Sequence, residues 1–415
     1  MKIRNDAKAM INTIIEENMP RVSVENALKE HDFGDSVYIV AIGKAAWTMA
    51  ETAVKFLGNK LKRGIVITKY HHSNGDIAPN VEIYEAGHPV ADQATIDATA
   101  KAIEMTKALN ENDDLLFLVS GGGSALFEKP LDGITLDDIQ DITTQLLKSG
   151  ADIVEMNMIR KRLSAVKGGR FAAMAAPAQV YAVILSDVVG DRLDSIASGP
   201  AVPDESTVQD ALKVFEKYNL ELTQLQVDYL KQETPKTVDN VKTAITGSVR
   251  TLIQSAEKIA KELGYNPTVL TSTMICEASE IGRFFGSVAA DVASGKNSFV
   301  RPCAIIAGGE TVVYVQGDGK GGRNQEIALS AAKGIAGLEN VLVFSLGSDG
   351  TDGPTDAAGG IVDGKTFAAL KEKGLDIDKT LANNDAYNAL KAVDSLITTG
   401  PTGTNVNDVT VILCL

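Results

Sequence analysis

The sequence predicts an α/β fold divided into two domains, and three observations lead to this prediction. The chain has 415 residues, which is more than a single hydrophobic core usually serves. Short apolar runs rich in β-branched residues alternate with longer segments of helical periodicity. That alternation is typical of βα units around a mostly parallel sheet, and runs that are apolar throughout indicate strands covered on both faces.

Strands are predicted at each short apolar run. In chain order they are Val37–Ile42, Gly64–Thr68, Val81–Tyr84, Leu115–Val119, Val180–Leu185, Val241–Thr246, Thr268–Thr271, Cys303–Ala307, Val341–Leu346 and Val409–Leu413. The clearest helices between them are predicted at Ala45–Leu57, Gln93–Leu109, Val249–Leu263 and Asn324–Ala336. The polar stretch 231–240 contains a proline and lacks apolar periodicity, so we place the boundary there, between domains of residues 1–235 and 236–415.

The composition excludes several classes of protein. A formal net charge of −14 argues against a nucleic-acid-binding surface. The three cysteines show no CxxC spacing and the four histidines form no HExxH pattern, so no zinc site is predicted. No apolar run reaches the ~18 residues that span a bilayer and no signal-peptide core is visible, so we expect a cytoplasmic protein without membrane partners. A homodimer is expected only because it is the commonest assembly.

Ligands of open parallel sheets bind beyond the carboxyl ends of the strands, and a glycine-rich loop lies at one such place. The strand predicted at Leu115–Val119 is followed by Ser120, Gly121, Gly122, Gly123 and Ser124. Glycines let the backbone approach a ligand closely, so the loop is interpreted as a cradle for phosphate, with a flexible turn as the alternative. Lys44 follows the first strand and can supply a positive charge to the same place, although a surface lysine fits the pattern equally well. No GxxxxGK[ST] motif is present.

A run of positive charge stands out in this acidic chain. No Asp or Glu occurs from Met156 to Ser186. One face of a predicted helix would carry Asn157, Arg160, Ser164 and Lys167. A solvated basic face is the plain interpretation, but unpaired positive charge indicates a bound anion. Asn157, Arg160 and Lys167 are therefore predicted to contact phosphate, and Asn157 and Arg160 could orient the substrate instead.

Two aspartates follow the strand predicted at Val180–Leu185. Asp187 ends that strand, and Asp191 lies four residues later in a loop with a glycine. Because Mg²⁺ in phosphoryl-transfer sites takes one or two carboxylates and phosphate oxygens, both are candidate metal ligands, and one could instead act as a base. Capping or turn roles would fully explain one of them.

Polar residues also follow the strands of the second half. Gly309 and Glu310 come after the strand at Cys303–Ala307, and Arg323 and Asn324 open the next helix. Arg323 could hold a carboxylate or a transferring phosphoryl group. The segment 317–322 formally matches the dinucleotide fingerprint GxGxxG but lacks the acidic residue at the expected offset, which keeps an oxidoreductase as the alternative.

Taken together, these segments resemble the class II glycerate kinase family, whose C-terminal domain is known as the MOFRL domain. The similarity runs from near residue 5 to the C-terminus. The motifs that carry it are Gly43-Lys44-Ala45-Ala46, Ser120–Leu126, Asn157–Arg170, Ser186–Pro200, Gly308-Gly309-Glu310-Thr311, Gly321–Glu326, Asp349–Gly360 and Thr399–Asp408.

The resemblance implies a fold, an activity and a set of site residues. It implies a larger Rossmann-like domain of three α/β/α layers and a smaller MOFRL-type α/β domain, with the active site in the cleft between them. The implied activity is ATP- and Mg²⁺-dependent phosphorylation of D-glycerate, normally to 2-phosphoglycerate. Lys44 and Arg323 match the residues that the family uses in catalysis. Members have often been labelled hydroxypyruvate reductases, so an NAD(P)H-dependent reductase remains the alternative.

A mechanism follows from this assignment as an expectation. Lys44 and the amides of the glycine loop would hold phosphate oxygens, and Arg323 would neutralise the transferring group or hold the glycerate carboxylate. Asp187 would contact Mg²⁺, with Asp191 as the base or a second ligand. Gly309, Glu310 and Asn324 are predicted to complete the nucleotide site.

Overall fold

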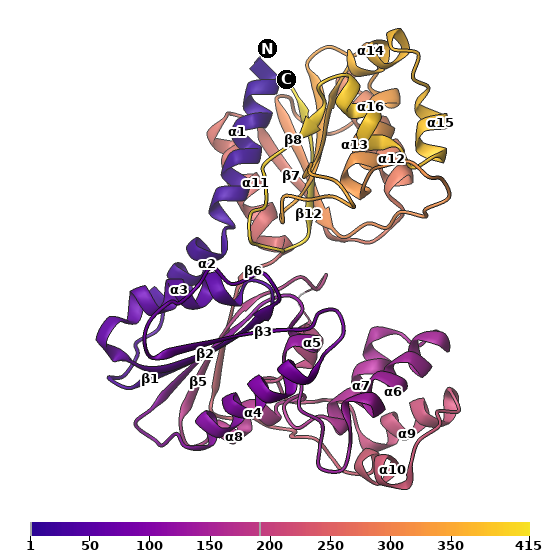
Figure 1. The fold of residues 1–415 in the computed structure, drawn as a ribbon. Helices are drawn as coiled ribbons and strands as arrows, with labels where there is room; N and C mark the ends of the chain where they lie inside the picture. Colours follow the sequence, from indigo (N-terminus) through magenta and orange to yellow (C-terminus); the bar gives the residue numbers. More distant parts are fainter. Residues whose placement is uncertain (1, 191) are drawn as a thin grey trace. The chain divides into compact units, whose positions relative to one another are not determined.

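The computed structural model describes residues 2–190 and 192–415. They divide into two compact units. The central unit comprises Ser23–Thr246, and the terminal unit joins Met1–Val22 to Gly247–Leu415. Figure 1 shows both units with their labelled elements.

The central unit is built around a parallel sheet. Its strands are β1 (Val37–Ile42), β2 (Leu61–Lys69), β3 (Val81–Ala86), β4 (Asp114–Val119), β5 (Gln179–Leu185) and β6 (Val241–Gly247). Their order in the sheet is β3-β2-β1-β4-β5-β6, and the pairs from β3 to β5 are parallel. This is the strand order of doubly wound nucleotide-binding folds, in which the direction of winding reverses between β1 and β4.

Helices cover both faces of this sheet and make the three expected layers (Figure 1). The helical elements are α2 (Pro20–Lys29), α3 (Ala46–Leu57), η1 (Gly58–Lys60), α4 (Gln93–Lys107), α5 (Gly123–Leu126), α6 (Leu136–Lys148), α7 (Ile153–Leu163), α8 (Arg170–Ala175), η2 (Ile196–Ser198), α9 (Val208–Lys217) and α10 (Gln224–Leu230). Helix α3 packs on β1 and β2, while α4 lies on the other face with α8. The core between α4, α8 and the sheet is apolar and includes Phe117, Phe127 and Phe171.

A second, purely helical core belongs to the same unit. Helices α6, α7, α9 and α10 pack together around Leu146, Ile159 and Leu230 (Figure 1). Helix α7 begins with a reciprocal cap, because the Asp152 carboxylate accepts from the N–H of Glu155 at 2.9 Å and the Glu155 carboxylate accepts from the N–H of Asp152 at 3.2 Å. The cap fixes the helix that carries Asn157 and Arg160.

The terminal unit has a mixed sheet. Its strands are β7 (Asn266–Met274), β8 (Cys303–Gly309), β9 (Val341–Gly347), β10 (Gly359–Asp363), β11 (Leu396–Ile397) and β12 (Asp408–Cys414). Their order is β11-β10-β9-β12-β8-β7, in which β7 and β8 are parallel and the other pairs are antiparallel. Strands β10 and β11 were missed by the sequence analysis, since β10 opens with two glycines and β11 has two residues.

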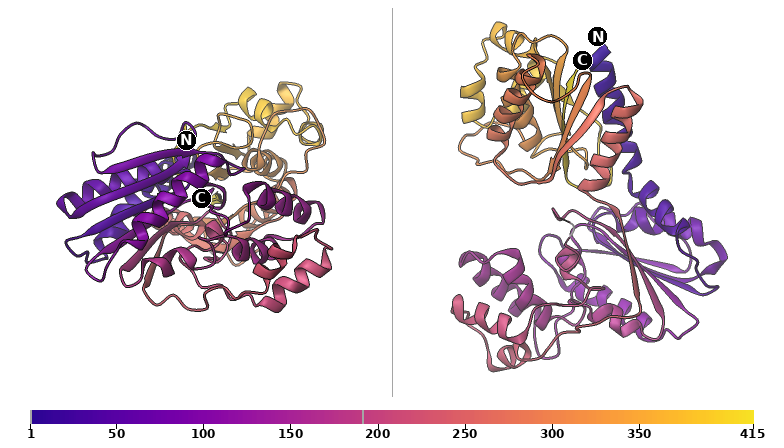
Figure 2. Two further views of the ribbon diagram at one scale, coloured as in Figure 1. Left: turned by 60° about the horizontal axis from the view of Figure 1, so that its bottom comes forward. Right: turned by 180° about the vertical axis from the view of Figure 1, so that it is seen from behind.

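Helices lie on both faces of this second sheet as well (Figure 2). They are α1 (Lys2–Glu17), α11 (Val249–Glu262), α12 (Ala278–Ala293), α13 (Arg323–Gly334), α14 (Thr366–Glu372), α15 (Ile377–Ala382) and α16 (Ala386–Ala392). Helices α12 and α13 pack closely against each other on one face, and α1 packs beside α11 on the other. No helix of the described residues is long and apolar enough to cross a membrane.

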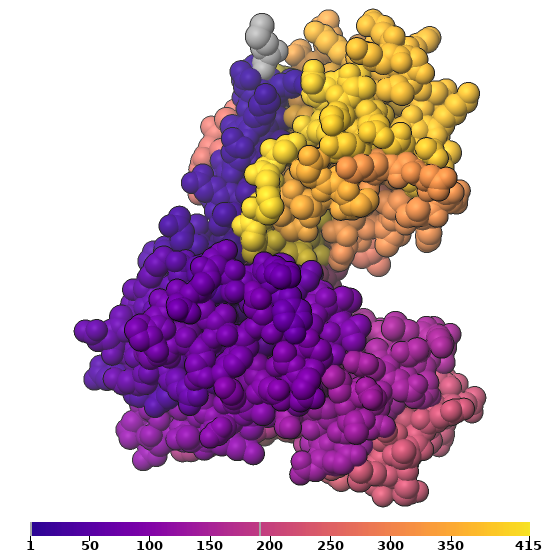
Figure 3. All heavy atoms as spheres, viewed as in Figure 1, coloured from indigo at the N-terminus to yellow at the C-terminus, as the bar shows by residue number. Residues whose placement is uncertain are grey.

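The division of the chain differs from the predicted domains of residues 1–235 and 236–415. The first helix belongs with the C-terminal part, where Asp6 accepts a hydrogen bond from Tyr265 at 2.7 Å and Asn18 donates to Ser255 at 3.0 Å. In Figure 3 the indigo atoms of α1 lie against yellow atoms of the C-terminal part. At the other boundary, β6 completes the first sheet. The prediction was wrong at both points because an amphipathic helix or a short edge strand does not reveal which sheet it will join.

We expect Met10→Ala in α1 to loosen the terminal unit. Met10 is fully buried, so its truncation should lower the free energy of unfolding by about 2–5 kcal/mol. Hydrogen–deuterium exchange should become faster in α11 and β12 and stay unchanged in β1 and β4. Lys8→Ala, at an exposed position of the same helix, is the control. Faster exchange in β1 instead would contradict the division described above.

Candidate functional site

The loops after β1 and β4 meet at the point where the winding of the central sheet reverses. The backbone N–H of Lys44 donates to the carbonyl of Gly121 at 2.9 Å, and that of Ala45 donates to the Ser120 hydroxyl at 3.1 Å. Ser120 in turn donates to the carbonyl of Ile42 at 3.2 Å. Ser120 is therefore buried, and its hydroxyl holds the two loops together.

Three side chains surround the glycine loop, and they lie close enough to explain two of its glycines. A Cβ built on Gly121 would stand 2.3 Å from Oδ2 of Asp187. A Cβ on Gly122 would stand 2.9 Å from the His88 ring and 3.4 Å from Cγ of Lys44, and the φ of 85° at Gly122 favours glycine in any case. The loop thus brings together a lysine, a histidine and an aspartate at the carboxyl ends of the strands.

His88 is a site residue that the sequence analysis missed. It follows β3, and its ring lies beside Gly122 and Lys44. Burial, with the positive charge of Lys44 as a second cause, lowers the pKa of His88 to about 4. The imidazole is therefore neutral at pH 7 and can both donate and accept a hydrogen bond. Its place directly after a strand end was the available signal in the sequence.

A second group of polar residues adjoins the other end of the glycine loop. We call Ser124, Asn157, Arg160 and Ser198 the Arg160 corner. Arg160 donates to the carbonyl of Ser124 at 3.3 Å, Ser198 donates to Oδ1 of Asn157 at 2.9 Å, and the hydroxyls of Ser124 and Ser198 are 3.3 Å apart. Ser198 has a φ of 61°, a left-handed conformation that non-glycine residues seldom adopt.

Lys167 has a different role from the one predicted. Helix α7 ends at Leu163, so Lys167 does not continue its face. Its ammonium group is completely buried, pairs with Glu128 at 3.0 Å, and donates to the carbonyls of Ser124 at 2.9 Å and Phe127 at 3.0 Å. These contacts occupy the three protons of the ammonium group. Lys167 therefore positions the glycine loop through these contacts.

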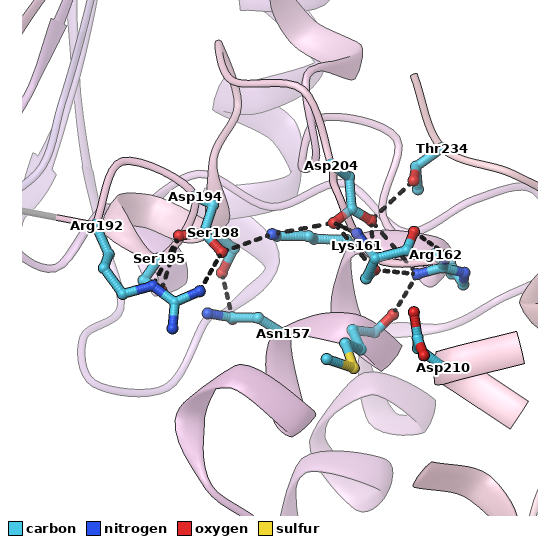
Figure 4. Close-up of polar contacts among 12 residues, drawn as sticks. Asn157, Lys161, Arg162, Arg192, Asp194, Ser195, Ser198, Asp204, Asp210 and Thr234 are labelled. Atoms are coloured by element: carbon cyan, nitrogen blue, oxygen red, sulfur yellow. Dashed lines mark hydrogen bonds and ion pairs between the residues drawn. The ribbon is translucent and has the colours of Figure 1, made fainter. Parts of the chain in front are cut away.

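The positive charges of the segment 156–186 are also paired with carboxylates more fully than the sequence suggested. Lys161 and Arg162 are buried and converge on Asp204, at 3.3 Å and 3.4 Å (Figure 4). Asp204 also accepts from Thr234 at 2.8 Å. The compensating carboxylate comes from beyond the basic segment, so a scan of that segment alone could not find it.

One of the two predicted magnesium ligands lies in the described part of the chain. Asp187 stands beside the glycine loop, whereas Asp191 lies outside the described residues. Among the described residues no three His, Cys, Asp or Glu side chains cluster as metal ligands would. A carboxylate next to the glycine loop nevertheless fits Mg²⁺, which keeps several waters and uses phosphate oxygens rather than an all-protein cage.

In the terminal unit, Arg323 begins α13, and its guanidinium group lies between the carboxylates of Asp408 and Glu310. Its guanidinium donates to both carboxylate oxygens of Asp408, with an Nη2–Oδ1 distance of 3.0 Å, and to Glu310 at 2.9 Å. Burial opposes the charge of Arg323, but the pairing with Asp408 outweighs it and raises the pKa. Burial has the opposite effect on the pKa of the Asp408 carboxyl group. It raises this pKa to about 6, although the hydrogen bond and charge of Arg323 act to lower it. Asp408 was not singled out from the sequence, although it directly begins the last strand.

Two predicted nucleotide contacts in this unit have structural roles instead. Asn324 is buried, donates its backbone N–H to Asp352 at 3.2 Å and accepts from Ser345 at 2.6 Å. Gly309 lies inside β8, where a Cβ would stand 2.2 Å from the carbonyl oxygen of Met274. Glu310 is exposed and pairs with Arg323, so it remains near the predicted group.

The glycines of the GxGxxG match are explained by packing. Cβ atoms on Gly317 and Gly319 would stand 2.5 Å and 2.4 Å from Asn383. Gly322 precedes Arg323 at the start of α13 and faces Asp352. The segment begins eight residues after the end of β8 and does not form the tight strand-to-helix turn of a dinucleotide fingerprint.

Comparisons with known proteins agree with this architecture. Residues 6–231 match the family model described as a domain of unknown function, DUF4147, and residues 303–408 match the MOFRL family. D-Glycerate 2-kinase of Thermotoga maritima is 54% identical over 394 residues, which cover 95% of this chain and 94% of that protein. Glycerate 2-kinase of Pyrococcus horikoshii is 40% identical over 433 residues, covering 99% and 97%. The crystal structure of glycerate kinase from Thermotoga maritima superposes with a TM-score of 0.96 at 52% identity, covering 99% of each chain.

His88 should make stability depend on pH in a defined window. Its folded-state pKa of about 4 lies below the ordinary 6.5, so the unfolded chain takes up a proton that the folded chain does not. Stability should therefore fall as the pH is lowered from 6.5 towards 4. Thermal unfolding measured across this range should show a weaker pH dependence in His88→Gln than in the wild type, with His71→Asn at an exposed position as the control. An NMR titration midpoint near 6.5 for His88 would contradict the assignment.

Proposed function

Because the chain belongs to the class II glycerate kinases, with DUF4147 and MOFRL regions, we propose that it transfers the γ-phosphoryl group of ATP to D-glycerate. The acceptor is the 2-hydroxyl, and the products are 2-phosphoglycerate and ADP. A cytoplasmic location and a homodimeric state belong to the same proposal and rest on general expectation.

The observation that carries the proposal is the arrangement of Lys44, Asp187 and the glycine loop at the switch point of the central sheet. Backbone groups of such a loop can approach phosphate oxygens, and a lysine supplies positive charge where the chain as a whole is acidic. In phosphoryl transfer little covalent chemistry is asked of the protein, so positioning and electrostatics account for most of the catalysis.

Each proposed catalytic group has a distinct task. Lys44 neutralises charge on the phosphate oxygens, and neutral His88 beside it can donate a hydrogen bond to the same oxygens or to the acceptor. Arg323 supplies a second positive charge to the transferring group. Its two hydrogen bonds to the Asp408 carboxylate hold the guanidinium group in a fixed orientation.

The step itself is a single displacement at phosphorus. The 2-hydroxyl oxygen forms the new P–O bond while the bond from the γ-phosphorus to the bridging oxygen of ADP breaks. The hydroxyl proton passes to a carboxylate, for which Asp187 and Asp191 are the proposed candidates. Mg²⁺, held by Asp187 and phosphate oxygens, would neutralise charge on the phosphates.

A reductase remains the second candidate only through its formal sequence match, because packing against Asn383 accounts for Gly317 and Gly319, and packing against Asp352 accounts for Gly322. One experiment separates the two activities. ADP release with D-glycerate and ATP supports the kinase, and NADH oxidation with hydroxypyruvate supports the reductase. Coupling the product to enolase distinguishes the two phosphoglycerates, since 2-phosphoglycerate is dehydrated directly and 3-phosphoglycerate is not.

We expect Lys44→Ala to lower kcat by about 10²-fold or more, because it removes a charge that acts on the transferring group. Arg323→Lys should have an effect of similar size, since it keeps the positive charge but loses the fork that matches Asp408. Steady-state kinetics with both substrates saturating is the measurement. Thermal unfolding should show Lys44→Ala close to the wild type, and near-normal turnover in both variants would refute the mechanism.

Asp187→Asn should weaken the binding of Mg²⁺. The amide keeps the size of the side chain but has no charge to attract the cation, so the Mg²⁺ concentration for half-maximal rate should rise by about tenfold or more. Titration of Mg²⁺ at fixed ATP measures this. Full activity with an unchanged Mg²⁺ requirement would remove Asp187 from the metal site. Asp228→Asn, on the exposed surface of α10, is the matched control.

A further inference from the structure

The Arg160 corner has more positive charge than its protein partners balance. The carboxylate that acts on Arg160 is Glu128, and Glu128 already pairs with Lys167 at 3.0 Å. Within residues 2–190 and 192–415, two cations thus share one buried carboxylate at this place. Burial lowers the pKa of both Arg160 and Lys167, against the opposing effect of the Glu128 carboxylate. A buried charge without full compensation is costly unless a ligand supplies the missing partner.

Donors at the same corner also lack partners. Asn157 is almost completely buried, and its Nδ2 makes no hydrogen bond within the described residues, although its Oδ1 accepts from Ser198 at 2.9 Å. The buried Nε of Arg160 likewise has no partner among the described residues. Figure 4 shows the amide of Asn157 directed away from the Lys161–Asp204 ion pairs. Buried unsatisfied donors in a native structure call for an explanation, and an absent acceptor is the simplest one.

We infer that the Arg160 corner binds the carboxylate of the acceptor acid and makes the enzyme specific for a hydroxy acid. The inference rests on the proposed kinase function and deepens it. A carboxylate carries one negative charge, which matches the surplus of one positive charge at the corner. It is also planar with two oxygens, so it can accept from the guanidinium and from the Asn157 amide together.

A phosphate group fits the corner less well. The γ-phosphate of ATP carries more negative charge than the corner lacks, and Lys167 has no proton left to contribute. The glycine loop beside the half-buried side chains of Lys44 and Asp187 is the better phosphate site, because charge and metal can be supplied there. The two sites lie at opposite ends of the glycine loop, with the corner joined to Ser124.

The position of the corner also bears on which hydroxyl reacts. In glycerate the 2-hydroxyl is on the carbon next to the carboxylate, whereas the 3-hydroxyl is one carbon further away. A carboxylate held by Arg160 therefore keeps the 2-hydroxyl close to the Ser124 end of the loop. The hydroxyls of Ser124 and Ser198, 3.3 Å apart, can accept or donate to it.

The test compares Arg160→Gln and Arg160→Lys with the wild-type full-length chain. KM for D-glycerate is measured at saturating ATP, and KM for ATP is measured at saturating glycerate. Glycerol, which lacks the carboxylate, serves as a neutral acceptor. Lys217→Gln is the matched control. Lys217 is an exposed cation of α9 that pairs with Glu155 of α7, the helix that carries Arg160.

Arg160→Gln should raise KM for glycerate by about 10- to 100-fold and leave KM for ATP within about twofold. The ratio of kcat/KM for glycerate to that for glycerol should fall by a similar factor. Arg160→Lys should recover part of the loss, because the charge returns without the second hydrogen bond. A rise in KM for ATP with KM for glycerate unchanged would overturn the inference and leave the kinase function standing. Absence of ADP release from the wild type with glycerate would instead refute the proposed function.

A second variant tests the surplus of positive charge through the melting temperature of the ligand-free protein. Asn157→Asp keeps the acceptor for Ser198 and places a carboxylate where the missing ligand is inferred. Because this carboxylate supplies the missing negative charge, we expect the melting temperature of the ligand-free protein to stay equal or rise, while KM for glycerate increases by at least tenfold. A clear fall in melting temperature would show that the corner has no surplus positive charge and would overturn the inference.

Discussion

The buried ammonium group of Lys167 holds the glycine loop in one conformation, and the arrangement of the site depends on it. It binds the carbonyl oxygens of Ser124 and Phe127, which are groups that a mobile loop would expose to water, and Glu128 compensates its charge. At the other end of the loop, the Ser120 hydroxyl joins the strand ends of β1 and β4. A loop fixed at both ends can present its backbone to phosphate with little loss of entropy on binding.

Charge in the central unit is therefore organised by burial rather than by the net charge of the chain. Lys161 and Arg162 share Asp204 and serve the structure, while Arg160, on the same helix, forms no ion pair of its own within the part of the chain that the structure describes. Surface interactions elsewhere contribute little, since exposed ion pairs are worth at most about 1 kcal/mol each. The difference between a paired and an incompletely paired cation is what distinguishes a scaffold residue from a ligand-binding residue here.

Most of the sheet could be predicted from the sequence, because buried parallel strands are nearly continuous apolar runs. The proximity of Lys44 and Asp187 could also be predicted, because both residues follow the carboxyl ends of strands, where the ligands of parallel sheets bind. The roles of Lys167 and Asn324 could not be predicted, since burial and hydrogen-bond partners are tertiary properties. His88 was overlooked for the same reason, because a histidine after a strand has no distinctive pattern until the neighbouring loop is in place.

The packing of α1 on the terminal unit has a consequence for biosynthesis. The central unit is a contiguous stretch and can fold as soon as residue 246 has left the ribosome, whereas the terminal unit needs both the first helix and the last strand. The apolar face of α1, which includes Met10 and Ile14, therefore lacks the strands and helices it packs against until about the end of translation. Nascent chains of this protein should thus be substrates for factors that shelter hydrophobic N-terminal helices.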